Sequence, residues 1–193
     1  MKKIIYCSII LAIITFNFKS VNASNIFKQR QAIIKTSNPL PFTNIFKNID
    51  YLKLNSAITS KDTLIIHSIL EKLNDQISRE FLLQYKIDLK SEFKTDYDKI
   101  TLIGLLYAGK ETFLPEIKDE NSTLRPPSDF GCFLTAVSTL IGIPQAQSIW
   151  NSIKAGATEQ TVVGALKLIG RRVGTIIGVA IMVYEVGECL NWW

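Results

Sequence analysis

Histidine occurs once in the 193 residues, as His67, and cysteine three times, as Cys7, Cys132 and Cys189. A structural zinc site needs several Cys or His ligands at short spacings, and one histidine with two distant cysteines does not supply them. His67 follows the apolar residues 64–66 directly, a setting in which a lone histidine is usually packed or half-exposed. We therefore expect no metal site.

Other catalytic groupings are missing as well. No glycine-rich phosphate loop follows a strand, because the glycines of the C-terminal third lie in helix-like sequence. Cys132 and His67 would form a nucleophile and base only if Cys132 were reduced. The sequence therefore predicts a non-enzymatic protein with no catalytic residue and no bound cofactor.

Long apolar runs are also absent. A membrane-spanning helix needs about 20 predominantly apolar residues. Residues 173–184 give only twelve uncharged positions, between Arg172 and Glu185, and the longer run 130–153 is interrupted by Pro144 and by amides and hydroxyls. Neither run predicts a membrane span.

The net charge is small once the N-terminal residues 1–23 are left out. The net charge of +5 includes Lys2, Lys3 and Lys19, without which 19 basic residues face 17 acidic ones, a net of +2. Residues 128–193 hold four basic and four acidic residues. With no basic patch interleaved with aromatics, we expect no nucleic-acid partner.

The N-terminus itself has the pattern of a signal peptide. Two lysines precede the apolar residues 4–16, and Val21-Asn22-Ala23 has the small-residue pattern of a cleavage site. Residues 1–23 are thus expected to be removed near Ala23, and the protein to be exported to the periplasm, the cell envelope or the medium. An uncleaved anchor is the alternative.

Export favours a disulfide between the two cysteines that remain, Cys132 and Cys189. In the chain-entropy model, a disulfide across this 57-residue separation stabilises the folded protein by on the order of 4 kcal/mol. Two buried free thiols are the alternative.

Helical periodicity recurs along the whole mature chain and predicts an all-α fold in two parts. Residues 24–127 form a polar, amphipathic helical region and residues 128–193 a compact, disulfide-closed subdomain of three or four helices. In the first part we expect helices at residues 43–54, from Ser60 or Asp62 to Tyr85, and at residues 96–108. Gly109 is expected to stop the last of these and to begin a linker, 109–127.

The second part has clear helix boundaries in its sequence. We expect a helix over residues 130–141 ended by Gly142, and a second from Pro144 to about Gly156 that has Ala146, Ile149, Trp150 and Ile153 on one face. A third is capped by Thr158 and continues almost to Cys189, with only a soft break around Gly174.

Two features of this third helix are candidates for function. Gly170, Gly174 and Gly178 recur every fourth residue, so on a helix they form a groove for close helix packing, either in a membrane-active hairpin or in a soluble subdomain. Tyr184, Trp192 and Trp193 form a candidate contact patch. We expect the tryptophans to be partly buried against Phe130 and Phe133.

A resemblance supports export. The segment that opens with Gly131-Cys132, passes through GALKLIGRRVGTIIGVAIMVYEVGEC and ends in Trp resembles the C-terminal parts of uncharacterised small exported proteins of Bacteroidota. It covers the last third of the chain and implies a shared module without an activity. More loosely, the glycine-rich, Trp-containing helices are similar to helical bacteriocins. Residues 128–193 differ from those peptides in having a net charge of zero.

Two functional hypotheses follow. The first is a non-enzymatic exported or cell-envelope protein that acts through contact with a protein or a surface. The second is a membrane-active, bacteriocin-like precursor whose C-terminal segment is released by cleavage in the linker. The sequence leaves the partner and the oligomeric state open.

Overall fold

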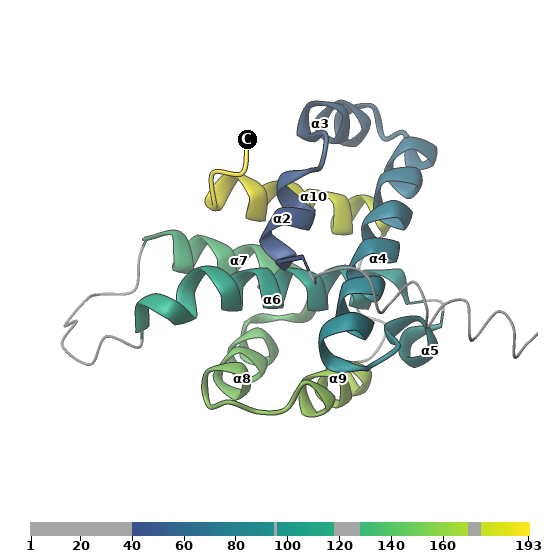
Figure 1. Cartoon of the computed structure of the whole chain (residues 1–193). Coiled ribbons are helices and arrows are strands. Elements are labelled where there is room, and N and C mark those ends of the chain that lie inside the picture. The colour runs from purple at the N-terminus through teal and green to yellow at the C-terminus, as the bar shows by residue number, and fades with distance from the viewer. Residues whose placement is uncertain (1–39, 95, 118–127, 170–174) are drawn as a thin grey trace, which may run out of the picture. The chain divides into compact units, whose positions relative to one another are not determined.

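A computed structural model of the chain describes residues 40–94, 96–117, 128–169 and 175–193. These residues form nine helices and no strand, so the all-α prediction is confirmed (Figure 1). The expected signal peptide lies outside the described residues. The helices are α2 (Phe42–Lys47), α3 (Tyr51–Ser60), α4 (Thr63–Tyr85), α5 (Leu89–Phe93), α6 (Tyr97–Ile117), α7 (Ser128–Ile141), α8 (Ile143–Lys154), α9 (Glu159–Leu168) and α10 (Ile176–Cys189).

The helices are arranged in layers (Figure 1). α6 and α7 lie side by side in the middle, α8 and α9 lie against one side of them, and α2, α3 and α10 lie on the other. α4 crosses beside α6 and connects to α3. One hydrophobic cluster runs through all of these layers, from Phe42 to Trp192.

The first helices are positioned by carboxylates from distant parts of the chain. α2 has no side-chain cap of its own, but the Glu111 carboxylate on α6 accepts the backbone N–H groups of Phe42 at 2.8 Å and Thr43 at 2.9 Å. Glu80 on α4 accepts the N–H of Leu40 at 2.9 Å. The start of α2 is therefore fixed by tertiary contacts that replace a local cap.

The prediction of a single helix at residues 43–54 is wrong. The chain forms two helices there, α2 and α3, because Asp50 caps α3 by accepting the N–H of Lys53 at 2.9 Å. An aspartate in this position favours a new helix start over continuation of the old one.

α4 confirms the expected long amphipathic helix. Asp62 caps it by accepting the N–H groups of Leu64 and Ile65, each at 3.1 Å. Leu64 in its first turn is 83% exposed. The buried stripe begins two residues further on and comprises Ile66, Leu70, Leu73, Ile77 and Phe81.

α6 continues through Gly109 to Ile117, so the predicted helix stop at Gly109 is wrong. A Cβ at Gly109 would overlap the ring of Phe133 on α7, and one at Gly104 would overlap Ile77 on α4. These glycines therefore permit close helix approach, and the expected linker begins no earlier than residue 118.

The first two C-terminal helices agree with the sequence. α7 ends at Ile141, before Gly142 with a φ of +89°. α8 buries the apolar face that the spacing predicts, namely Ala146, Ile149, Trp150 and Ile153.

The expected third helix is in fact two helices. Thr158 caps α9 as predicted, but α9 ends at Leu168 and α10 begins at Ile176. Thr175 caps α10 by accepting the N–H of Gly178 at 3.4 Å. The long apolar sequence predicts a nearly continuous helix because periodicity alone does not locate the end of one helix and the start of the next.

Four helices thus follow residue 127, as expected, and Cys132 and Cys189 lie at disulfide distance with Cα atoms 5.8 Å apart. Their core is continuous with that of the preceding helices. α10 packs most extensively on α7 and also contacts α3, α4 and α6, and residues 39–193 form one compact unit. The expected boundary near residues 126–127 therefore does not separate two cores.

Candidate contact surface

α10 is apolar on both of its faces. Its inner face is buried in the core: Val179, Ala180, Met182, Val183 and Val186. Its outer face carries Ile177, Ile181, Tyr184 and Glu188, which recur at helical spacing. Ile181 is 39% exposed, and Ile177 and Tyr184 are half-buried. We call these four residues the α10 stripe.

Trp193 extends the α10 stripe at its C-terminal end. Its ring stacks on Tyr51 of α3 with centroids 3.9 Å apart and lies 4.8 Å from the ring of Tyr184. It remains 47% exposed. Tyr184 and Trp193, both predicted as contact residues, thus lie together on the surface, next to isoleucines that the prediction did not include.

Trp192 belongs to the core. It is 8% exposed, and its ring stacks on Phe46 of α2 at 5.3 Å. The expected burial against Phe130 and Phe133 is wrong, because those rings pack with Phe113 and Trp150 on the other side of α7. Trp192 therefore anchors the C-terminal turn and is not part of a contact surface.

The C-terminal turn holds the two tryptophans in these different environments. Asn191 has a φ of +50°. The N–H of Trp192 donates to the carbonyl of Gly187 at 3.0 Å, and the N–H of Asn191 donates to the carbonyl of Glu188 at 3.2 Å. This is the Schellman pattern of helix termination, with asparagine in the left-handed position. A Cβ at Gly187 would overlap both Trp193 and Tyr51, so this glycine makes room for the stacked rings.

The cysteine pair fixes the same end of α10. Cys189 is the last residue of the helix, and Cys132 lies in the second turn of α7. Paired cysteines leave no thiolate for a Cys132–His67 couple, and His67 lies within 3.8 Å of Glu71 on α4. The hypothetical nucleophile and base are therefore not assembled.

Of the three glycines predicted to form a groove, the structure describes Gly178. Gly170 and Gly174 lie outside the described residues. A Cβ at Gly178 would meet no heavy atom within 4 Å, so Gly178 is not a close packing contact. Among the described glycines, those in close packing contact are Gly104, Gly109 and Gly187.

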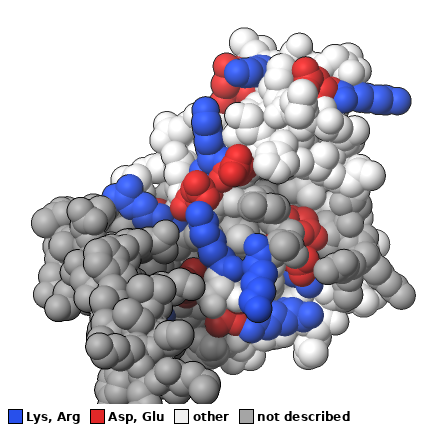
Figure 2. All heavy atoms as spheres, turned by 90° about the vertical axis from the view of Figure 1, so that its right-hand side faces the viewer, with Lys and Arg blue, Asp and Glu red and all other residues white. Residues whose placement is uncertain are grey.

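Charged side chains of both signs are interspersed on the face shown in Figure 2. Several form pairs between helices, such as Lys90 with Asp75 at 2.6 Å and Lys167 with Glu92. The C-terminal end of α10 differs, because Glu185 and Glu188 form no ion pair with any described residue. Among the described residues, this end of the helix is therefore acidic without a paired cation.

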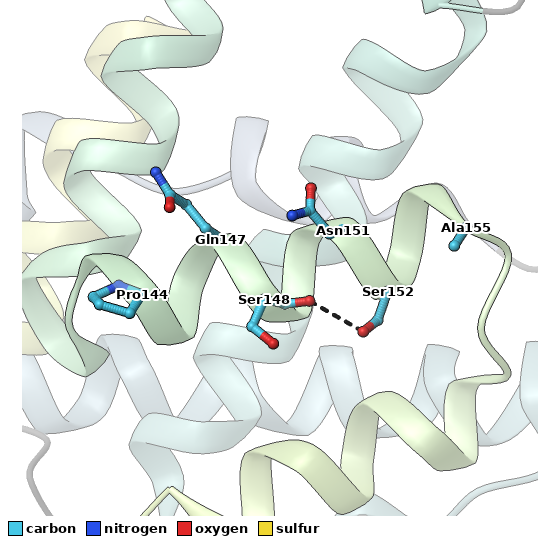
Figure 3. Close-up of a pocket in the computed structure, with 6 residues that line it drawn as sticks. All are labelled: Pro144, Gln147, Ser148, Asn151, Ser152 and Ala155. Carbon is cyan, nitrogen blue, oxygen red and sulfur yellow. Dashed lines mark hydrogen bonds between the residues drawn. The ribbon is translucent and has the colours of Figure 1, made fainter.

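A shallow hollow lies along the outer face of α8 (Figure 3). Its described lining comes from one helix and has no ionisable group: Pro144, Gln147, Ser148, Asn151, Ser152 and Ala155. The Ser152 hydroxyl donates to the carbonyl of Ser148 at 3.0 Å, within the helix itself. These side chains do not converge on a point where a reacting group would bind.

Within the described ranges, no three His, Cys, Asp or Glu side chains gather closely enough to hold a metal ion. Among the helices of these same ranges, none has the length and apolar character to cross a membrane. In comparisons with known proteins, no family model, no curated protein and no solved structure matches this chain.

The sequence pointed to Tyr184 and Trp193 but missed Ile177 and Ile181. The spacing of these isoleucines to Tyr184 is a detectable signal once α10 is taken as a separate helix. It was hidden because the buried residues between them are equally apolar.

Proposed function

We propose that this is a non-enzymatic exported protein that acts through contact with another protein, and that the α10 stripe with Trp193 is the contact surface. The signal-peptide pattern of residues 1–23 supports export. The cysteine pair at disulfide distance is consistent with an oxidising compartment.

The apolar outer face of α10 carries this proposal. A helix that is apolar all round is normally covered on every side. α10 packs with one face on the core, while on its other face Ile181 is exposed together with Trp193, and Ile177 and Tyr184 are half-buried beside them. Aromatic side chains rimmed by polar groups are the typical centres of protein interfaces.

Release of residues 128–193 as a membrane-active segment gains no support from this packing. Such a segment would have to detach α10 from α3, α4 and α6, which precede the expected cleavage region. Detachment would expose core residues such as Val183 and Val186, both of which are fully buried.

The native size of the exported protein tests the proposal. We expect the wild-type protein, isolated with mild detergent from cells that make it, to migrate in a protein complex larger than its own chain. Ile181→Asp should release the protein as a smaller species, because a carboxylate in an apolar contact costs binding energy. Ser152→Asp on α8 is the matched control and should leave the complex intact.

An activity assay on the same preparation would expose an enzyme. Turnover of any substrate in a broad hydrolase panel by the purified wild-type protein, with no complex detected, contradicts the proposal.

A further inference from the structure

We propose that the α10 stripe binds an amphipathic helix of a partner protein that carries Lys or Arg at one end. This inference rests on the proposed contact function and names the chemistry of the partner. It follows from the order of side chains along α10, which are apolar at the N-terminal end and acidic at the C-terminal end.

The apolar part of the stripe has the spacing of helix-in-groove recognition. Ile177, Ile181 and Tyr184 stand at positions i, i+4 and i+7, the repeat with which one helix meets another. Trp193 stacks beside Tyr184 and widens the stripe on the side of α3. A partner helix with apolar residues at the same repeat would cover these side chains.

The acidic part determines the charge of the partner. Glu185 and Glu188 lie in the last two turns of α10, where the helix dipole is negative and acidic side chains are unfavourable. The last turn of α10 has no basic residue, and neither glutamate forms an ion pair with a described residue. A Lys or Arg from outside would interact favourably with both carboxylates, with the helix end and with the exposed face of Trp193.

Other occupants fit this charge pattern less well. In an antiparallel pairing of two copies through α10, Glu188 would face Ile177 of the second copy, and in a parallel pairing like charges would meet. The described segment 175–193 carries no Lys or Arg that would pair with these glutamates in either arrangement. An anionic bilayer would be repelled by the same two carboxylates.

The surface is held by contacts within the chain. The Cys132–Cys189 pair and the turn at Asn191 fix the C-terminal end of α10, and its inner face is packed on α7. A preformed helix loses little conformational freedom when a partner binds, which favours affinity for a small surface.

Site-specific photo-crosslinking tests the proposal in the full-length exported protein. A benzophenone amino acid replaces Ile181, and a matched variant carries it at Ser152 on the outer face of α8. Both are expressed in cells that make the protein, and cross-linked peptides are identified by mass spectrometry. We expect position 181 to link to a helical segment of another protein that contains apolar residues at helical spacing and Lys or Arg near one end.

Charge reversal then tests the role of the acidic end. With the identified segment as a synthetic peptide, Glu188→Lys should weaken binding about tenfold, and Glu188→Gln about threefold. Glu71→Lys, the same charge change on the exposed surface of α4, should leave the affinity unchanged. Circular dichroism confirms that each variant is folded.

Four outcomes overturn the inference: a cross-link between two copies of this chain, a lipid adduct, no adduct at position 181 above the control, or equal binding by Glu188→Lys and wild type. A protein cross-link from position 152 alone would reject the α10 stripe as the contact surface and keep only the proposal that the protein acts through contact with another protein. Absence of a partner at both positions, together with a monomeric native size, would reject both.

Discussion

Within the described helices, three glycines occupy positions at which a methyl group would collide with a neighbouring helix or with the C-terminal tail. Gly104 lies against Ile77, Gly109 against Phe133, and Gly187 against Tyr51 and Trp193. Each lies inside a helix, where glycine is unfavourable by about 1 kcal/mol relative to alanine. The closer approach of the neighbouring side chains offsets that cost.

Alanine substitutions distinguish packing glycines from the others. Gly109→Ala should lower the free energy of unfolding by about 1–3 kcal/mol, because the new Cβ forces Phe133 out of place. Gly178→Ala is the matched change in an open position and should be neutral or stabilising by up to about 1 kcal/mol. Urea denaturation measures both. An equally large loss at Gly178 would restore it as a packing glycine.

Buried tyrosines predict an alkaline limit of stability. Burial raises the pKa of Tyr51, Tyr85 and Tyr107, and that of Tyr85 to about 12, with Glu159 and Glu111 adding to the effect. In the unfolded chain tyrosine ionises near pH 10. These groups therefore contribute full stability below about pH 10, and the contribution is lost as the pH rises from there through the folded-state pKa values.

Urea midpoints between about pH 8 and pH 12 measure this limit. Tyr85→Phe should reduce the slope of stability against pH above about pH 10, because one ionisable group is removed. Lysine deprotonation in the same range is common to both proteins, so the difference between them isolates the tyrosine. Identical slopes would contradict the prediction.

At the scale of elements, helix ends are fixed partly by local caps and partly from a distance. Asp50, Asp62, Asp88 and Thr158 cap the helices that follow them directly. α2 instead depends on Glu111, 69 residues away from Phe42. A six-residue helix is too short to be stable without such support.

Removal of this distant cap should destabilise α2 first. Glu111→Ala leaves the N–H groups of Phe42 and Thr43 without their acceptor, and we expect a loss of about 1–2 kcal/mol. Hydrogen exchange should show faster exchange in residues 42–47 than in α8. Glu71→Ala, on the exposed face of α4, is the control. Unchanged protection of α2 would show that its packing alone holds it.

At the scale of the whole molecule, the part that follows residue 127 shares its core with the part that precedes residue 118. α10 returns to α3, α4 and α6, and Trp192 stacks on Phe46. The cysteine pair lies wholly within residues 128–193. The two parts are thus joined by non-covalent packing as well as by the peptide chain.

Cleavage between residues 118 and 127 should therefore leave the fragments associated. With a protease site inserted there, we expect the cut protein to elute as one species in native size-exclusion chromatography and to separate in urea. A synthetic oxidised peptide of residues 128–193 should show incomplete folding, because its α10 lacks its contacts to α3, α4 and α6. Separation of the fragments without denaturant would favour the released-segment hypothesis.

The candidate surface was only partly predictable. Tyr184 and Trp193 stand out in the sequence because Tyr and Trp, which combine a large apolar ring with a polar group, are enriched at interfaces. Trp192 looks identical in sequence, yet the left-handed turn at Asn191 sends it into the core and leaves Trp193 outside. No local pattern distinguishes these neighbours.

The sequence by itself determined the helical class, the cap at Thr158 and the apolar face of α8; it narrowed the start of α4 to Ser60 or Asp62 and favoured the pairing of Cys132 with Cys189. These depend on residues close in the chain or on the few cysteines present. Only the tertiary structure decided that Gly109 lies within a helix, that α9 and α10 are separate, and that α10 exposes an apolar stripe. Each of these depends on which distant segment packs against a residue, and periodicity along one helix does not contain that information.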